Sequence, residues 1–216
     1  MNVRSDEDLT ARARIRDAAV DRFGRDGFGV GVRAIAADAG VSAALVIHHF
    51  GSKDGLRQAC DTFVLEAVRR EKADAMTEQS PSEVVGRLAF IEAYAPLFAY
   101  IVRSLMEGGA LAAKFVDGLV EDADAYLEAG EQAGKVRPSD DRHGRSRTVV
   151  ATQVGLIVMA QLDAAAGRGT APTDDPAAAM KELYASTLLA GLELYTHGIF
   201  TDSAYLDAYR EFKEKS

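Results

Sequence analysis

The chain has 216 residues, of which 48% are hydrophobic and 27% charged, and its formal net charge is −8. This composition is that of a folded soluble chain and excludes global disorder, while the negative charge argues against a protein that coats nucleic acid over its whole surface. Cys60 is the only cysteine, which excludes an internal disulfide and a cysteine-based zinc site.

Charge is unevenly distributed along the sequence. Residues 1–57 carry nine Lys and Arg against eight Asp and Glu, whereas residues 58–216 carry sixteen against twenty-five. The two parts are therefore expected to face different partners. No stretch approaches the roughly 20 unbroken apolar residues of a membrane span, and residues 1–8 are polar and acidic, unlike a signal peptide. We therefore expect a cytoplasmic protein without a membrane partner.

Apolar residues recur at helical spacing almost throughout, and strand-type alternation is nowhere sustained. The sequence therefore predicts an all-α fold of about nine or ten helices. The first helix is expected over residues 10–25, with Ile15 and Phe23 on its apolar face. Two short helices are expected next, over residues 32–39 and 43–50.

A longer helix is predicted over residues 53–75 and should connect two domains. We place their boundary inside it, so that residues 9–69 form a small N-terminal domain and residues 70–216 a larger helical one. Pro81 and Pro96 fall where further helices could begin. The remaining helices are expected over residues 97–106, 111–133, 145–166, 176–197 and 203–214.

The spacing of small and apolar residues between the second and third helices is informative. Ala36 allows close approach of the helices, Gly40 accepts a left-handed backbone at the corner, and Val41 and Val46 can fill the wedge between them. This pattern predicts a helix-turn-helix. A plain hairpin of two helices is the alternative that spacing alone leaves open.

About 45 residues, from Arg14 to Arg57, resemble the DNA-binding domain of the TetR family of bacterial transcriptional regulators. The resemblance implies that residues 9–69 form a DNA-binding domain, with a helix-turn-helix over residues 32–51. It implies that residues 70–216 form a variable helical domain for ligand binding and dimerisation. The residues that carry it are Ala18-Ala19, Phe23, Gly27-Phe28, Ile35-Ala36, Ala39-Gly40-Val41-Ser42, His49-Phe50, Lys53 and Leu56.

The same resemblance implies which residues read DNA bases. Arg33, one position into the second helix, lies where family members reach a base edge, and an arginine can pair bidentately with guanine. Ser42 caps the recognition helix, which Ala43, Ala44 and Leu45 open. Because these three side chains are apolar, we expect contacts with thymine methyl groups rather than side-chain hydrogen bonds.

Further residues are implied to contact the DNA backbone or groove. Ile47 stands where the family usually has a phosphate-binding tyrosine, and it cannot donate a hydrogen bond. His48 is at a groove-facing position, and His49 at one that approaches a phosphate. Lys53, together with the backbone N–H groups that open the next helix, is expected to clamp a phosphate.

The adjacent histidines allow other readings. Neighbouring residues on a helix point about 100° apart, and no Cys, Asp or Glu assists at the next turn, so His48 and His49 do not predict a metal site. No serine or cysteine nucleophile stands at a telling spacing, so they do not predict catalysis. A structural role, bonded to the backbone, remains the alternative to DNA contact.

A ligand cavity among the helices between residues 53 and 166 is implied by the resemblance. Aromatic residues at helical spacing are more often core than ligand box, so core packing is the alternative. Because polar candidates are sparse, we expect a small, largely apolar molecule. The candidate lining residues are Phe90, Tyr94, Phe98, Met106, Phe115, Gln153 and Met159.

The helices expected over residues 145–166 and 176–197 have long apolar faces. The resemblance implies that they pair with their counterparts across a twofold axis in a homodimer. Burial against their own subunit is the alternative. The faces contain Val150, Val154, Ile157 and Gln161 in the first helix and Tyr184, Leu188, Gly191 and Tyr195 in the second.

Together these features predict a DNA-binding transcriptional regulator and not an enzyme. We expect a repressor that binds palindromic double-stranded operator DNA as a dimer and is released by a small-molecule effector. No cofactor is expected. A protein-binding adaptor or a helical enzyme that has lost operator binding is the alternative. Ile47 and the small Ala43 and Ala44 favour the adaptor, whereas an enzyme would need a convergent acid/base cluster, which the sequence does not show.

Overall fold

A computed structural model of the chain describes residues 3–77 and 80–215, and within these it is helical with no strand. The all-α prediction is therefore confirmed. The elements in chain order are α1 (Val3–Asp26), α2 (Val32–Asp38), α3 (Ala43–Phe50), α4 (Lys53–Thr77), α5 (Pro81–Gly86), the 3-10 helix η1 (Arg87–Tyr94), α6 (Ala95–Glu107), α7 (Gly109–Gln132), α8 (Arg142–Ala165), α9 (Pro176–His197) and α10 (Ala204–Glu214).

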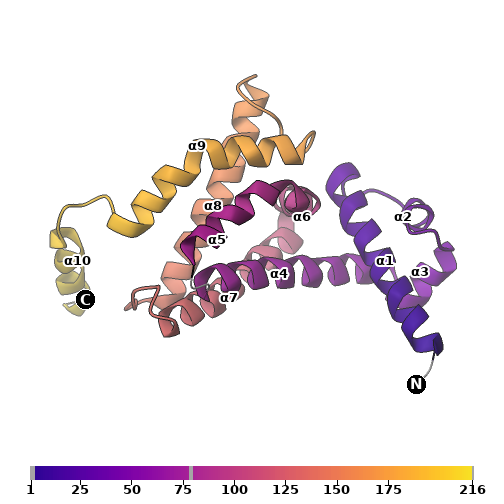
Figure 1. The fold of residues 1–216 in the computed structure, drawn as a ribbon, viewed down its shortest axis with the longest axis horizontal. Helices are drawn as coiled ribbons and strands as arrows, with labels where there is room; N and C mark the ends of the chain where they lie inside the picture. Colours follow the sequence, from indigo (N-terminus) through magenta and orange to yellow (C-terminus); the bar gives the residue numbers. More distant parts are fainter. Residues whose placement is uncertain (1–2, 78–79, 216) are drawn as a thin grey trace.

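An N-terminal head of three helices stands at one end of the molecule, and α4 runs from it along the larger helical body (Figure 1). Phe23, Ile35, Val46 and Leu56 are fully buried in one cluster that joins α1 to α4. Burying apolar side chains of this size stabilises a fold by about 1.5–3 kcal/mol each. This cluster fixes the position of α3 on the head.

The same core cluster continues into the body. Tyr100 of α6 and Phe115 of α7 pack with the head residues, α1 packs along α6, and α4 packs along α7. The helix α4 is continuous through residues 69 and 70, where we expected the domain boundary. Head and body therefore share one hydrophobic core. The division into residues 9–69 and 70–216 stays a prediction.

The helices differ from the expected ones at two places, and the second difference follows from Pro96. The helix α1 begins at Val3, earlier than expected. Where the sequence predicted one helix after Pro81, the structure has the short α5 followed by the 3-10 segment η1. Pro96 has no N–H to give and sits in the first turn of α6, so the chain makes a new helix start there.

The body contains a second cluster, in which α7 packs against α8. Ala123, Tyr126 and Leu127 of α7 are buried against Val150 of α8. Along α9, Ala179 and Met180 are buried near its start, and this part lies against α6 and η1. The later turns of α9 are exposed, and α10 stands apart from the body beyond a linker (Figure 1).

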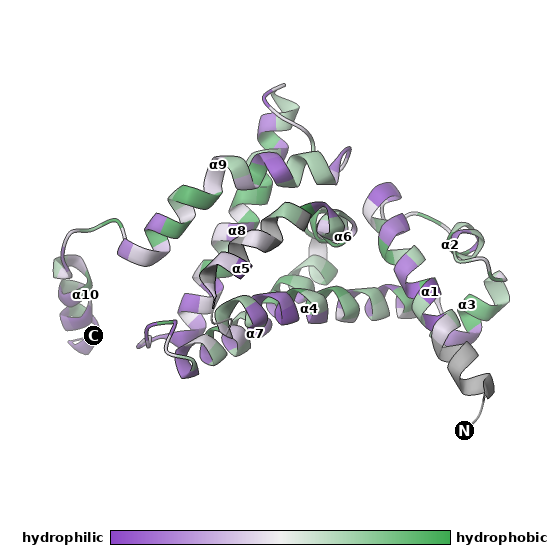
Figure 2. Ribbon diagram, in the orientation of Figure 1, coloured by the Kyte–Doolittle hydropathy of each residue, from purple (hydrophilic) through white to green (hydrophobic). Residues whose placement is uncertain are grey.

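One helix of the described chain, α8, is long and apolar enough to cross a membrane by length and composition. Only 11% of its most apolar window is buried in the single subunit. A single helix of this kind is weak grounds for a membrane protein, because a helix that pairs with another protein surface has the same composition. Figure 2 shows hydrophobic residues along α8 and α9.

Candidate nucleic-acid interface

The corner between α2 and α3 has the backbone that the sequence predicts. Gly40 adopts φ of +66°. The Val41 N–H donates to the carbonyl oxygen of Ala36 at 2.9 Å, and the Gly40 N–H donates to that of Ala37 at 3.1 Å. A side chain at this φ would cost roughly 1–2 kcal/mol, so glycine makes the tight corner possible. The two helices therefore cross without a longer loop.

The wedge between the helices is filled as expected. Ala36 and Val46 are buried, and Val41 packs half-buried against the same cluster. Because no larger side chain separates the backbones at Ala36, α3 lies close on α2. The predicted helix-turn-helix is confirmed.

The recognition helix α3 begins with a side-chain cap. The Ser42 hydroxyl accepts a hydrogen bond from the Leu45 N–H at 3.2 Å, which satisfies one of the free donors of the first turn. Ala43 packs half-buried on the core, and Leu45 is also half-buried. Ser42 therefore stabilises the start of α3. Ala43 and Leu45 hold α3 on the core and are only partly accessible from outside.

The outer face of α3 consists of Ala44, Ile47 and His48, at a spacing of three and four residues. All three are exposed, and the Ile47 side chain is 43% exposed. Arg33 is exposed on α2. This stripe is what α3 can offer to a major groove, because α-helices enter that groove with one face. Ile47 belongs to it, although the sequence reasoning treated it only as a missing tyrosine.

The start of α4 follows directly after α3. The Ser52 hydroxyl accepts from the Gly55 N–H at 3.0 Å and so opens α4. A Cβ on Gly55 would come 2.1 Å from the carbonyl oxygen of Phe50, so glycine lets the end of α3 approach α4. Lys53 is partly exposed in this first turn. A cation beside a helix N-terminus is suited to a phosphate.

Arg12 of α1 holds the other end of the recognition helix. Its guanidinium donates to the carbonyl oxygen of His49 at 2.8 Å and lies 4.7 Å from the centre of the Phe50 ring. A cation favours the C-terminal end of a helix, where carbonyl groups lack partners. Sequence reasoning missed this residue. The sequence signal for Arg12 is its spacing of one helical turn from Arg16, which puts both arginines on one side of α1. Arg16 in turn lies 3.7 Å from the centre of the Phe63 ring.

The side chains of His48 and His49 point in different directions. The rings of His48 and His49 meet edge to face with centres 5.6 Å apart, and His49 meets Phe50 in the same way at 6.1 Å. His48 is exposed and His49 is half-buried. His48 thus belongs to the outer stripe, and His49 packs beside the end of α3, so the structure brings only the first onto the outer face.

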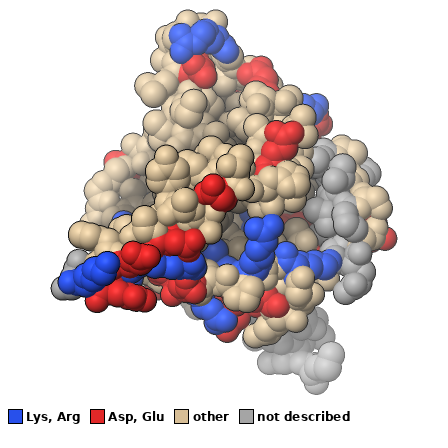
Figure 3. Space-filling model, turned by 90° about the vertical axis from the view of Figure 1, so that its left-hand side faces the viewer, with Lys and Arg blue, Asp and Glu red and all other residues tan. Residues whose placement is uncertain are grey.

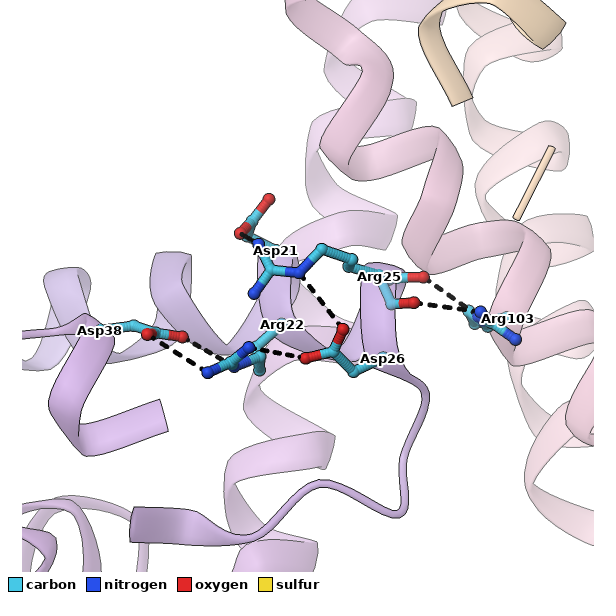
Figure 4. A network of polar contacts seen from close by, with 7 residues as sticks. Asp21, Arg22, Arg25, Asp26, Asp38 and Arg103 are labelled. Atoms are coloured by element: carbon cyan, nitrogen blue, oxygen red, sulfur yellow. Dashed lines mark hydrogen bonds and ion pairs between the residues drawn. The ribbon is translucent and has the colours of Figure 1, made fainter. Parts of the chain in front are cut away.

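An ion-pair network connects α2 to α1 within the head (Figure 4). Arg22 pairs with Asp38 at 2.8 Å and with Asp26 at 2.7 Å, and Arg25 pairs with Asp26 at 3.2 Å. Desolvation works to raise the pKa of Asp26, but hydrogen bonds from Arg22 and Arg25 outweigh it and leave this pKa lowered. The lowered pKa keeps the Asp26 carboxylate charged at neutral pH.

The end of α1 is fixed on α6 by three contacts. Arg103 donates to the carbonyl oxygen of Gly24 at 3.1 Å and to that of Arg25 at 3.0 Å (Figure 4). A Cβ on Gly24 would come 2.9 Å from the Ala99 Cβ. Because Arg103 satisfies carbonyls that the helix end leaves free, α6 caps α1. A shift of α6 would therefore displace the end of α1 in the head.

Tyr100 is the buried centre of the same junction. Its hydroxyl donates to Asp61 at 2.6 Å, and its ring meets Phe28 at 5.5 Å and Phe115 at 6.4 Å. Burial raises the pKa of the Tyr100 hydroxyl, and the nearby Asp61 carboxylate raises it further. Tyr100 therefore remains a neutral donor that ties α6 to α4.

Cys60 of α4 is fully buried in the core of the head. Burial raises the pKa of its thiol to about 12. Since thiolates and not thiols react, the side chain acts as small core filler.

The expected ligand residues whose side chains the structure describes differ in their burial. Phe115 is buried in the core beside Tyr100, Tyr94 and Phe98 are half-buried, and Met106 is 43% exposed. Phe90 is in η1, and its side chain lies outside the described residues. These four aromatic residues therefore stay a prediction as a lining.

Gln153 and Met159 lie on the outside of α8. Gln153 is exposed and Met159 is 59% exposed, whereas Val150 and Ile157 face the body and are buried. Met159 is two residues, about 200° of helix rotation, from Ile157 and so points to the opposite side. Within this subunit neither residue lines an interior space.

The fold and the exposed stripe define a class: a helix-turn-helix protein whose recognition helix is rigidly mounted on a helical body. Comparison with known proteins agrees. Residues 15–60 match the family model described as bacterial regulatory proteins, tetR family, and residues 92–201 match the one described as tetracyclin repressor-like, C-terminal domain.

A full-length relative is also similar. The HTH-type transcriptional regulatory protein RaaS of Mycobacterium tuberculosis is 47% identical over 203 residues, covering 94% of this chain and 92% of the relative. A crystal structure of the TetR family transcriptional regulator PfmR from Thermus thermophilus aligns with TM-score 0.42 and 24% identity, over 64% of this chain and 81% of that chain.

The chain belongs to the TetR family of bacterial transcriptional regulators. The family predicted from residues 14–57 is therefore confirmed. The relatives are transcriptional regulators and not enzymes.

Proposed function

We propose that this regulator is a cytoplasmic repressor, which binds a palindromic operator as a homodimer and leaves it when a small, largely apolar effector binds the body. The observation that carries the DNA-binding part is the exposed stripe Ala44, Ile47 and His48 on a helix fixed at both ends, by Ser42 and by Arg12. A rigid helix with an unobstructed face is what groove entry requires.

Each residue of the interface has a proposed task. Arg33 reads a base edge from α2, and Ala44 and Ile47 contact thymine methyl groups. His48 donates into the groove, and Lys53 with the first turn of α4 binds a phosphate. Ala43, Leu45 and His49 support the helix from below, where they are half-buried.

A homodimer is supported by the exposed apolar residues of α8 and α9. On α8 these are Val158, Met159 and Leu162, with exposed fractions from 37% to 63%. The apolar face that we expected on α8, with Val150 and Ile157, is instead buried in its own subunit. Pairing through the outer residues would bury the apolar window of α8 and place two heads on one duplex.

The junction of α1 with α6 supports effector control. Arg103, Tyr100 and the close approach at Gly24 transmit any displacement of α6 to α1. An effector that binds better to a body with displaced α6 would lower the population of heads spaced for the operator. Binding of operator and effector then oppose each other by the same factor in both directions.

The test is a fluorescence anisotropy titration of the chain with duplex DNA from upstream of its own gene, at several salt concentrations. The native chain is expected to bind at moderate salt, and Lys53→Ala should weaken binding and reduce the salt slope by about 1 for each phosphate that the variant no longer neutralises. Lys135→Ala, an exposed lysine beyond α7, is the matched control. Absence of binding by the native chain to its own upstream DNA would instead favour an adaptor.

A further inference from the structure

The C-terminal arm, which we define as residues 199–214, places large apolar side chains in solvent. Its exposed aliphatic residues are Ile199 at 79% and Leu206 at 52%. Its exposed aromatic residues are Phe200 at 64%, Tyr205 at 72%, Tyr209 at 63% and Phe212 at 66%. Isolated exposed apolar residues are ordinary, but six in sixteen residues form a patch of the kind that marks an interface.

The aromatic residues of α10 share one face. Tyr205, Tyr209 and Phe212 follow at intervals of four and three residues, and the rings of Tyr209 and Phe212 lie 6.4 Å apart in a stacked arrangement. None of the residues of α10 is buried. An isolated helix of eleven residues is marginal in water, so such a helix depends on packing of its apolar face.

The contact between α10 and its own subunit uses the opposite face. Arg210 pairs with Asp140 of the loop between α7 and α8, and also with Asp207 at 3.2 Å. At 100° per residue, Tyr205 is about 140° and Phe212 about 160° around the helix from Arg210. The ion pair therefore turns the aromatic face away from its own subunit.

The linker before α10 completes the apolar surface. Phe200 and Tyr205 pack with ring centres 4.8 Å apart, and together with Ile199 and Leu206 they line a shallow depression that is open to solvent. Figure 3 looks onto this end of the molecule: uncharged residues cover much of its centre, and charged residues gather along its lower edge. The arm thus offers an exposed aromatic stripe next to a shallow apolar surface.

The charge of the arm argues against a membrane or nucleic acid as its partner. Over residues 199–214 the acidic residues Asp202, Asp207, Glu211 and Glu214 outnumber the basic residues Arg210 and Lys213. A helix that lies on an anionic membrane has an excess of basic residues on its polar face, and so does a surface that binds phosphates. A polar rim that carries both charges with a small acidic excess, around an aromatic face, fits a protein surface better than either of these.

A second copy of this chain provides such a surface where the arm begins. The exposed residues Leu189, Leu192 and Tyr195 on α9 lead toward Ile199 and Phe200, and Glu193 lies one turn after Leu189 on the same side of the helix. This apolar surface continues the α8–α9 face that we propose as dimer interface. The area fits as well: four aromatic side chains at about two-thirds exposure offer on the order of 500 Å² per arm, against roughly 800 Å² per partner in a standard interface.

We propose that the C-terminal arm of each subunit packs its aromatic stripe on the second copy, so that the two arms clasp the dimer beyond the α8–α9 helices. The inference rests on the proposed homodimer and names an additional surface for it. Exchange of a terminal element between identical subunits is a low-cost route to a stable dimer, because each arm replaces a contact that its own subunit does not make.

The first experiment measures the dimer dissociation constant by sedimentation at graded concentrations. The double variant Tyr209→Ser with Phe212→Ser is expected to weaken the dimer at least tenfold, because it removes two aromatic anchors. Leu111→Ser changes an apolar residue on α7 that is 49% exposed and outside the arm, and it should leave the constant unchanged. Circular dichroism checks that both variants keep their helical content.

The second experiment asks to which subunit the arm belongs. One tagged chain carries Phe212→Cys and a differently tagged chain carries Leu189→Cys, and the mixed dimers are treated with a bismaleimide of about 10 Å reach. The buried Cys60 does not react. A cross-link between the two differently tagged chains is expected. As control, both cysteines are placed in one chain and mixed with an excess of unaltered chain, where little cross-linking within that chain should occur.

Three outcomes would overturn the inference. A dissociation constant that changes less than twofold in the double variant means that the arm does not stabilise the dimer. Cross-linking confined to a single chain means that the arm packs on its own subunit. In either case a chain that remains dimeric and binds its upstream DNA leaves the proposed function intact. A native chain that is monomeric overturns the clasp and the homodimer together, and the anisotropy titration reports on DNA binding separately.

Discussion

The hydroxyl of Tyr100 on α6 donates a hydrogen bond of 2.6 Å to the carboxylate of Asp61 on α4. This bond crosses from the body to the connecting helix, inside a core that also contains Phe28 and Phe115. Body and head are therefore joined by a specific polar contact as well as by apolar packing.

Tyr100→Phe should destabilise the chain by about 1–3 kcal/mol at pH 7, because it removes the donor of a charge-assisted hydrogen bond and leaves the carboxylate partly buried. Urea unfolding followed by circular dichroism measures the change. Phe98→Leu, at a half-buried position of the same helix without this bond, is the comparison and should cost less.

The penalty of Tyr100→Phe should depend on pH. Burial raises the pKa of Asp61, while the Tyr100 hydrogen bond lowers it, and the net shift is upward. A carboxyl whose pKa is raised in the folded state binds more protons in the folded than in the unfolded chain. The folded protein therefore loses stability as the pH rises from the ordinary pKa of the carboxyl through its folded-state pKa. Without the donor the folded-state pKa rises further. The difference between variant and native chain should therefore be larger at pH 7 than near pH 4, and an equal difference at both would refute this role.

Gly24→Ala should separate α1 from α6. The added Cβ would meet the Ala99 Cβ at 2.9 Å and the Tyr100 nitrogen at 3.0 Å, neither of which can rotate away. We expect a loss of about 1–3 kcal/mol from overpacking, which outweighs the gain of up to about 1 kcal/mol in helix propensity. Thermal unfolding measures it. Gly86→Ala, where no atom lies within 4 Å of the added Cβ, should be neutral or stabilising.

Arg103→Ala should weaken communication more than DNA binding. The variant frees the carbonyl groups of Gly24 and Arg25 at the end of α1 but leaves the recognition helix untouched. Operator affinity is expected to change less than threefold, while the decrease in affinity caused by a bound effector shrinks by tenfold or more. Anisotropy titrations with and without a ligand identified from co-purified material provide both values. Arg70→Ala on the exposed side of α4 is the control, and an unchanged effector response in Arg103→Ala would contradict the role of α6.

Ile47→Tyr should strengthen operator binding several-fold. The side chain is 43% exposed on the outer stripe of α3, so a tyrosine hydroxyl at that position can reach a phosphate oxygen. Ile47→Phe supplies the ring without the hydroxyl and serves as the matched control. Equal affinity of the two variants in anisotropy titrations would mean that position 47 makes no phosphate contact.

Local sequence alone determined the head. Gly40 permits the left-handed corner, Ala36 permits close approach, and Ser42 caps α3, and each acts within a few residues of its own position. Such short-range constraints are visible in the sequence because the residue types that satisfy them are few. The helices, their order and the family followed from the same local patterns.

Tertiary structure decided which faces of the helices turn inward. Periodicity shows that α8 has apolar residues, but both Ile157 and Met159 are apolar, and only packing within the body buries the first and leaves the second exposed. The contacts of Arg12, Tyr100 and Arg103 join residues 37 to 79 positions apart. No local propensity encodes such contacts, because they arise only when α1, α4 and α6 meet in space.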